Sequence, residues 1–162
     1  MPELPEVETV RRGMEPVLRG RRIQDVVVRR GDLRRRVPKN FKDRVAGRVA
    51  AEILRRGKYI VVMLEGGGGF VLHLGMSGRI KIRKADSGED YATHDHVVFV
   101  LENRTEIIFN DPRRFGMVFP VDTDWEKETP FSEMGPEPLE KKFTAQVLHE
   151  KIKNKNATIK SA

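Results

Sequence analysis

Apolar residues at the start of the chain recur with helical spacing. They are separated by three, three, four, three and one positions, at Leu4, Val7, Val10, Met14, Val17 and Leu18. This stripe predicts a short amphipathic helix. Pro5 fits its first turn, and Pro16 is expected to end or kink it near its last turn, where Gly20 also stands.

Beyond this helix the pattern changes to short runs rich in Val, Ile and Phe, separated by turn residues. Such runs predict a meander of about eight antiparallel strands. The expected strands are 23–28, 49–54, 59–64, 70–74, 79–82, 97–101, 107–109 and 117–121. Four consecutive glycines, 66–69, are interpreted as a hairpin turn and not as a phosphate cradle, because no Lys-Ser or Lys-Thr follows them.

The fold class that follows is mainly β with helices: a two-sheet antiparallel β-sandwich with an N-terminal helix and the start of a C-terminal helical domain. Residues 1–121 would form the sandwich domain. Residues 122–140, with 7 acidic residues, one Lys and four prolines or glycines, are expected to be a linker. Residues 141–162 would begin the helical domain, with Thr144 as a cap and an apolar face at Val147, Leu148 and Ile152. A further apolar pattern starts at 158, so we expect the chain to be the N-terminal part of a longer protein.

Composition narrows the class of protein. The 162 residues include no cysteine and are 38% hydrophobic. One packed core fits this length, and disulfide-stapled and cysteine-zinc folds are excluded. No run approaches the roughly 20 apolar residues of a membrane span, and the first residues do not resemble a secretory signal. We therefore expect a cytoplasmic protein without a membrane partner.

Positive charge is concentrated in one third of the chain. The net charge is +7, and residues 11–58 hold 17 basic and 5 acidic residues. Such a concentration favours a polyanionic partner, most often nucleic acid, because lysine and arginine release the counterions condensed on phosphates. The alternative is a solvated basic face without a partner.

Pro2 would carry a free secondary amine if Met1 were removed. Secondary amines form iminium ions with aldehydes, and Glu3 and Glu6, one helical turn apart, could donate and accept protons beside it. The alternative is purely structural, since proline and glutamate are favoured in the first turn of any helix.

Two glycine-rich loops could enter a base stack. Met76 stands in His73-Leu74-Gly75-Met76-Ser77-Gly78, and Arg113 and Phe115 stand in Asp111-Pro112-Arg113-Arg114-Phe115-Gly116. A methionine or aromatic wedge beside arginine can replace an extruded nucleotide. Each also has a structural interpretation, as core filler or surface turn.

Two other sites have weaker patterns. Lys58, after Gly57, could reach a phosphate or be one surface lysine among many. His94 and His96 share one face of a predicted strand but lack a clear third ligand, so we interpret them as ordinary strand residues and predict no metal site. No serine or cysteine suggests a hydrolase triad.

Four ordered motifs together resemble the formamidopyrimidine-DNA glycosylase (Fpg/Nei) family. They are Pro2-Glu3-Leu4-Pro5-Glu6-Val7-Glu8-Thr9, Arg56-Gly57-Lys58-Tyr59 and the two loop motifs above. The run Gly135-Pro136-Glu137-Pro138-Leu139 also resembles the family's linker into its helix-two-turn-helix domain. The resemblance implies a bacterial-type bifunctional glycosylase and abasic-site lyase that removes oxidised purines from damaged double-stranded DNA.

The resemblance also implies a role for each matching residue. Pro2 would attack C1′ of the damaged nucleoside to give a Schiff base, with Glu3 as proton shuttle. Lys58, the third catalytic residue, would contact the substrate's backbone and lesion region. Glu6 would support the lesion pocket, and His73 would bind a phosphate. The gap left by the flipped nucleotide would be filled by Met76, Arg113 and Phe115.

The resemblance also implies that family members carry a structural zinc in a four-cysteine finger beyond this chain, so no cofactor is expected here. Activity would be impaired without that part, and the alternative is a DNA-binding fragment without turnover. A proline-terminated tautomerase would explain Pro2 but not the basic third. We expect a monomer, with self-association through the helical end as the alternative.

Overall fold

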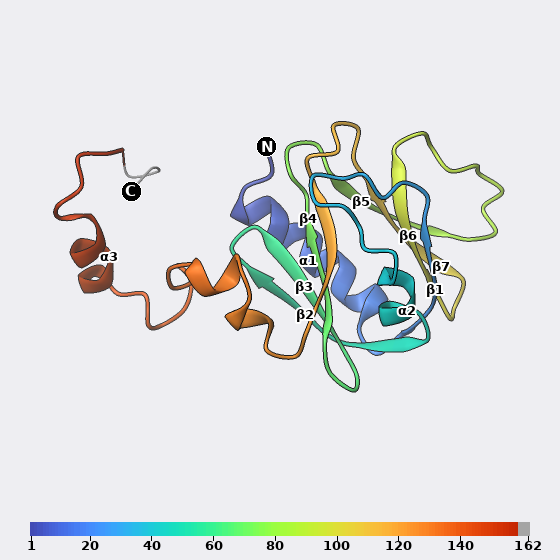
Figure 1. Ribbon diagram of the computed structural model, residues 1–162, viewed down its shortest axis with the longest axis horizontal. Coiled ribbons are helices and arrows are strands. Elements are labelled where there is room, and N and C mark those ends of the chain that lie inside the picture. The colour runs from blue at the N-terminus through green and yellow to red at the C-terminus, as the bar shows by residue number, and fades with distance from the viewer. Residues whose placement is uncertain (159–162) are drawn as a thin grey trace.

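The computed structural model describes residues 1–158, and its elements follow the predicted order closely (Figure 1). The helices are α1 (Leu4–Leu18), α2 (Phe41–Val45) and α3 (Ala145–Ile152), with 3-10 turns η1 (Trp125–Lys127) and η2 (Phe131–Glu133). The strands are β1 (Arg22–Val28), β2 (Arg48–Arg56), β3 (Tyr59–Leu64), β4 (Gly69–His73), β5 (Arg79–Lys84), β6 (Asp95–Leu101), β7 (Thr105–Asn110) and β8 (Met117–Val121).

The eight strands form one antiparallel sheet in the order β5-β7-β6-β1-β2-β3-β4-β8. The junction between β1 and β2 is narrow, because only Arg22↔Val49 and Ile23↔Arg48 pair across it. Both strands have an irregularity just beyond this junction, between Ile23 and Asp25 and between Ala50 and Glu52. Such irregularities bend strands. The sheet therefore folds into two four-stranded halves, and the predicted sandwich is confirmed with the refinement that its two sheets are joined.

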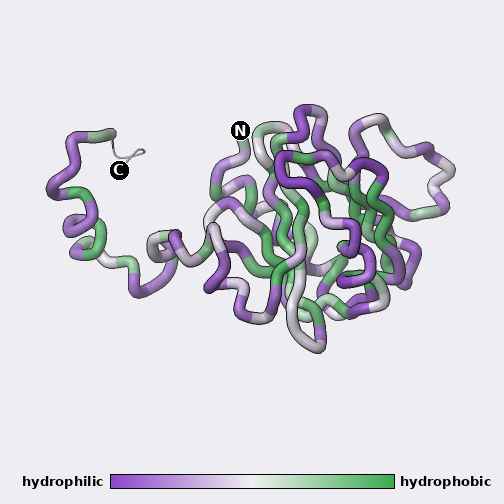
Figure 2. The backbone as a smooth tube through the Cα atoms, viewed as in Figure 1, coloured by the Kyte–Doolittle hydropathy of each residue, from purple (hydrophilic) through white to green (hydrophobic). Residues whose placement is uncertain are grey.

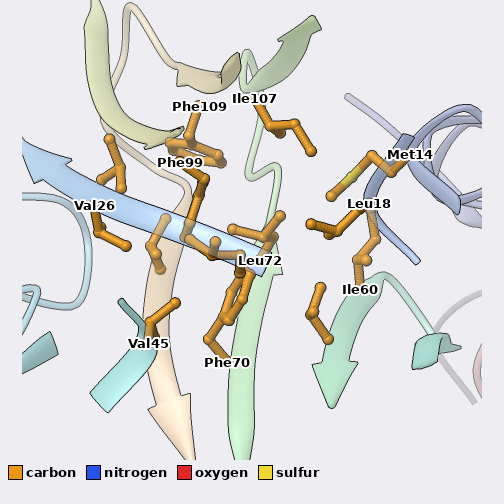
Figure 3. Close-up of a cluster of buried hydrophobic side chains, with 14 of the residues drawn as sticks. Met14, Leu18, Val26, Val45, Ile60, Phe70, Leu72, Phe99, Ile107 and Phe109 are labelled. Atoms are coloured by element: carbon orange, nitrogen blue, oxygen red, sulfur yellow. The ribbon is translucent and has the colours of Figure 1, made fainter. Parts of the chain in front are cut away.

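Aromatic side chains show that the two halves face each other. Phe70 on β4 stacks on Phe99 on β6, with ring centroids 4.7 Å apart, although three strands separate β4 from β6 in the sheet order. Phe41 of α2 packs edge-on against both rings, with centroids 6.1 and 6.2 Å away. Figure 3 shows this cluster with Met14 and Leu18 of α1 beside it. The helix α2, which the sequence pattern did not predict, thus supplies one of the central side chains.

Residues 122–140 pack closely against the outer face of the second half. Trp125 and Phe131 are buried there, with ring centroids 4.8 Å apart. They cover a second apolar cluster, which contains Val61, Val71, Phe119 and Val121. Both faces of β3, β4 and β8 are therefore buried, which explains their continuous hydrophobic runs (Figure 2). The expectation of a linker overlooked this packing; the domain boundaries themselves stay predictions.

The helix α3 lies apart from the sandwich (Figure 1). Thr144 caps it as expected, because its hydroxyl oxygen accepts from the Val147 N–H at 3.3 Å. None of its residues is buried, and Leu148 is exposed. Self-association through this face stays a prediction, and the apolar pattern expected from 158 onward lies almost wholly outside the described residues.

The helix α1 and the glycine hairpin form as predicted. Pro16 lies in the last turn of α1, which ends at Leu18, and Gly20 follows with a φ of +74°. Between β3 and β4, Gly66, Gly67 and Gly68 all have positive φ, a conformation that glycine adopts without steric cost.

Candidate functional site

The N-terminus and the β2–β3 turn meet at an ion pair. Glu3 is the residue before α1, and Lys58 stands in the two-residue turn after Gly57, whose φ of +57° suits glycine. The Lys58 ammonium lies 2.5 Å from a carboxylate oxygen of Glu3, and about a third of each side chain is exposed. Glu3 directly follows Pro2 in the chain, so the Lys58 ammonium is paired with a carboxylate next to Pro2. With Met1 in place, the Pro2 nitrogen is an amide, and its use as an amine requires removal of Met1.

Glu6 has a local structural contact. Its carboxylate accepts a hydrogen bond from the Glu3 backbone N–H at 3.0 Å, as a residue of the first helical turn does in a capping box. The residue is exposed. The capping interpretation is therefore present in the structure, and a role for Glu6 in a lesion pocket stays a prediction.

His73, at the end of β4, is arranged to donate a hydrogen bond. Its Nδ1 accepts from the Gly75 N–H at 3.1 Å, so the neutral ring carries its proton on Nε2. Burial lowers the pKa of His73, and the positive charges of Arg34 and Lys58 lower it further. The ring also packs on Tyr59, with centroids 4.5 Å apart. A neutral imidazole with a fixed Nε2–H suits a phosphate oxygen.

An apolar cavity of about 390 Å³ opens beside this histidine. It is lined by Met1, Arg34, His73, Gly75, Met76 and Phe115. Met76 and Phe115 are both 42% exposed, although they line the same cavity. Arg113 lies with its guanidinium 4.9 Å from the Phe115 ring centroid. The structure thus brings the N-terminus, His73, Met76 and Phe115 around one cavity, with Arg113 beside it.

Arg34 belongs to this site but was not singled out from the sequence. It lines the apolar cavity and also a neighbouring cavity of about 360 Å³ beside Tyr59 and Met117. Its loop is tied to the Phe115 loop, because Asp32 and Arg114 form an ion pair at 2.5 Å. Arg34 lies in a run of three arginines, and its neighbours gave no signal that this one would face the cavities.

A buried glutamate supports the turn that carries Lys58. Glu137 is only 6% exposed, and its carboxylate lies 2.9 Å from Arg55 and 3.1 Å from Arg56. It also accepts a hydrogen bond from the Gly57 N–H. Burial raises the pKa of Glu137, but the hydrogen bonds from Gly57 and Arg56 and the pairing with Arg55 outweigh this and lower it overall. The run 135–139, which the sequence pattern predicted to be part of a linker, therefore holds the β2–β3 turn in place.

The two histidines near β6 do not form a metal centre with neighbouring residues. His96 is buried and its Nε2 lies 2.8 Å from the Asp111 carbonyl oxygen, while the His94 ring is 6.2 Å away. Within residues 1–158 no group of three or more histidine, cysteine, aspartate or glutamate side chains could hold a metal ion. Because the sequence has no cysteine, its residues do not fit a four-cysteine zinc site. No helix in this described range is long and apolar enough to cross a membrane.

The fold and the site define a β-sandwich in which the N-terminus and two glycine loops line one cavity, and a lysine turn pairs with Glu3. The family model of the formamidopyrimidine-DNA glycosylase N-terminal domain matches residues 1–118, and the chain belongs to this family. This confirms the resemblance carried by the four motifs.

Curated relatives match over the whole chain. The formamidopyrimidine-DNA glycosylases of Wolbachia pipientis wMel and Azorhizobium caulinodans are 43% and 44% identical to it. The match covers 100% of this chain and 59% of each relative. The chain therefore spans about three fifths of the length of these proteins.

Two solved structures also resemble this chain. Lactococcus lactis Fpg in complex with abasic-site DNA has a TM-score of 0.85 at 28% identity, covering 99% of this chain and 59% of that one. The MutM (Fpg) protein of Thermus thermophilus has a TM-score of 0.76 at 36% identity, covering 93% and 52%.

Proposed function

We propose that this chain is the catalytic, DNA-binding part of a base-excision repair glycosylase and abasic-site lyase that acts on oxidised purines in duplex DNA. The observation that carries the proposal is the Glu3–Lys58 ion pair next to Pro2, whose other neighbour, Met1, lines a cavity together with His73, Met76 and Phe115. The family match supports it, as does the similarity to Lactococcus lactis Fpg, which has been solved with abasic-site DNA.

The chemistry begins at Pro2. After removal of Met1, its secondary amine attacks C1′ as the damaged base departs, or attacks the aldehyde of an existing abasic site. When the amine has displaced the base, cleavage of the C1′–O4′ bond opens the sugar ring and gives an iminium ion. When it has added to the aldehyde of an abasic site, the carbinolamine loses water to give the same iminium ion. Glu3 exchanges the protons that these steps require, and the ammonium of Lys58 holds the Glu3 carboxylate beside the amine and faces the phosphate backbone.

The remaining residues hold the DNA. The Nε2–H of His73 donates to a phosphate oxygen, and the basic third of the chain adds contacts that are independent of sequence. We call Met76, Arg113 and Phe115 the wedge residues: they occupy the gap left when the damaged nucleotide turns out of the helix. The exposure of Met76 and Phe115 in the free protein supports this role, since large apolar groups at the surface are available for a partner.

Borohydride trapping tests the chemistry. An aldehyde in reach of the Pro2 amine forms an iminium ion, which hydride reduces to a stable adduct with abasic-site DNA. We expect trapping by the protein whose N-terminus is confirmed as Pro2 by intact mass, less trapping by Pro2→Gly, and none when one residue is added before Pro2. An extended protein that traps as well as the processed one would refute Pro2 as the nucleophile and would make Lys58 the candidate.

The alternative function is DNA binding without turnover. Under that alternative the chain binds abasic-site duplex but yields no adduct, even when mass spectrometry shows Pro2 to be free. We also expect excision of an oxidised purine to be weaker than trapping, because binding contacts that lie outside this chain lower the barrier to base extrusion.

A further inference from the structure

Asp111 connects the two loops that carry the wedge residues. Its side chain is fully buried, with 0% exposure. One carboxyl oxygen accepts from the Ser77 hydroxyl at 2.6 Å and from the Arg113 N–H at 3.2 Å. The other accepts from the Gly116 N–H at 2.8 Å. A single carboxyl group therefore contacts the loop after Met76 and both ends of the Arg113–Phe115 segment.

The two loops also pack closely against each other. Gly75 has a φ of +61°, and a Cβ on it would lie 2.4 Å from the Phe115 carbonyl carbon. A Cβ on Gly116 would lie 2.7 Å from the His73 carbonyl oxygen. The two loops are thus in direct backbone contact, and small shifts of one displace the other.

The backbone of Asp111 is held as well. Its carbonyl oxygen lies 2.8 Å from Nε2 of the buried His96, and its N–H donates to the His94 carbonyl at 3.0 Å. His96 lies in β6 and His94 directly before it, so Asp111 is anchored to the sandwich while its side chain reaches the loops.

We propose that Asp111 is a positioning residue that holds the wedge residues in one fixed arrangement through its buried carboxyl group. This inference rests on the proposed function, in which those residues enter the base stack. Fixing them before DNA arrives removes the ordering cost that two loose loops would add to binding.

Asp111→Asn tests the inference with almost no change of size. An amide offers one acceptor and one donor, whereas the backbone N–H groups of Arg113 and Gly116 can only donate. If the amide nitrogen faces Gly116, the Gly116 N–H loses its acceptor. If it faces Arg113, the Arg113 N–H keeps only the Ser77 hydroxyl oxygen, at 3.2 Å, as acceptor. The matched control is Glu106→Gln, because Glu106 is also buried and accepts from Arg83 and Tyr91, away from both loops.

The first readout is the ratio of affinities for abasic-site duplex and single strand of the same sequence. We expect Asp111→Asn to lower this ratio by about tenfold, the effect of one lost buried hydrogen bond, and Glu106→Gln to leave it unchanged. We also expect Met76→Ala to cost less than twofold in the Asp111→Asn background, because residues that act together are not additive. An unchanged ratio, or additive losses, would overturn the inference.

The second readout does not depend on DNA. Hydrogen–deuterium exchange of residues 74–78 and 112–116 should be slow in the wild-type chain and faster in both loops together in Asp111→Asn. Should that variant fail to fold, Ser77→Ala removes only the bridging hydroxyl and is expected to loosen the same two loops. If wild-type protein shows no duplex preference, the proposed function fails. If exchange rises in neither loop or in one alone, the positioning role fails.

Discussion

Glu137 allows a quantitative test of how the segment after the sandwich supports the β2–β3 turn. The change is Glu137→Gln, which keeps the shape of the side chain and removes its charge. In the structure the carboxylate lies between Arg55 and Arg56, whose side chains are 9% and 19% exposed, and accepts from the Gly57 N–H. The variant therefore leaves two largely buried guanidinium groups without this counter-charge.

The expected cost follows from the burial of this cluster. Removing one partner of a buried ion pair costs about 3–5 kcal/mol, and the amide oxygen retains part of the hydrogen bonding, so we expect a loss of about 3 kcal/mol in the free energy of unfolding. For a domain of this size each kcal/mol lowers Tm by roughly 2–4 °C, which gives a decrease of roughly 6–12 °C.

The pH dependence gives an independent check. The folded-state pKa of Glu137 is lower than its ordinary value of 4.5. A carboxyl group of this kind contributes stability that is fully present above the unfolded-state pKa and is lost as pH falls through the folded-state pKa. The difference in stability between wild type and Glu137→Gln should therefore be large at about pH 7 and smaller at about pH 3.

Thermal unfolding followed by circular dichroism measures both effects. The control is Glu140→Gln, because Glu140 pairs with Lys142 at 2.8 Å at the surface, with 49% of its side chain exposed. We expect this control to change stability by less than about 0.5 kcal/mol. A Glu137→Gln variant that melts within about 2 °C of wild type, or whose deficit is the same at both pH values, would show that the cluster does not stabilise the fold.

Three further predictions concern the proposed DNA-binding face. Affinity for duplex DNA should fall steeply with salt, with a slope in log K of about −0.9 for each phosphate neutralised; affinity that is flat between about 50 and 200 mM salt would contradict binding through the basic third of the chain. Met76→Ala and Phe115→Ala should weaken binding of abasic-site duplex more than of single strand, since only a duplex needs a wedge; equal losses measured by fluorescence anisotropy would remove that role. Gly75→Ala should lower stability by about 3 kcal/mol, because Gly75 has a positive φ and contacts Phe115. The control Gly88→Ala, at a φ of +72° with open space around it, should cost only about 1 kcal/mol. Equal losses in chemical denaturation would refute the close contact.

The strands could be predicted because their signal is local. Each predicted run lies within or beside an observed strand, and the runs 59–64 and 117–121 match β3 and β8 without a shift. The pairing of β1 with β2 through two residues could not be predicted, because it depends on which strands meet after the sheet bends. The short helix α2 was missed for a similar reason: its helical state depends on Phe41 packing against Phe70 and Phe99.

The candidate site was likewise predicted only in part, because some of its residues are marked by local motifs and others are not. The motifs indicated Lys58, His73, Met76 and Phe115, because glycines and charges at turns are visible in the sequence. Glu137 was read as part of an acidic linker, since nothing in its neighbours shows that two arginines far earlier in the chain surround it. Contacts between distant residues that neutralise buried charge are the part of a site that a single sequence does not display.

The placement of the site follows from how the chain connects the two halves of the sandwich. The chain crosses between the halves three times within the strand region, from β1 to β2, from β4 to β5 and from β7 to β8. These connections carry Arg34, Met76 and the Arg113–Phe115 segment, respectively. These loops are also held to one another, by the Asp111 carboxyl group and by the ion pair between Asp32 and Arg114. Loops fixed in this way suit side chains that must meet a partner without first being ordered. The cavity therefore lies where the two halves are joined, and we expect changes that loosen the packing of Phe70 on Phe99 to weaken DNA binding as well as stability.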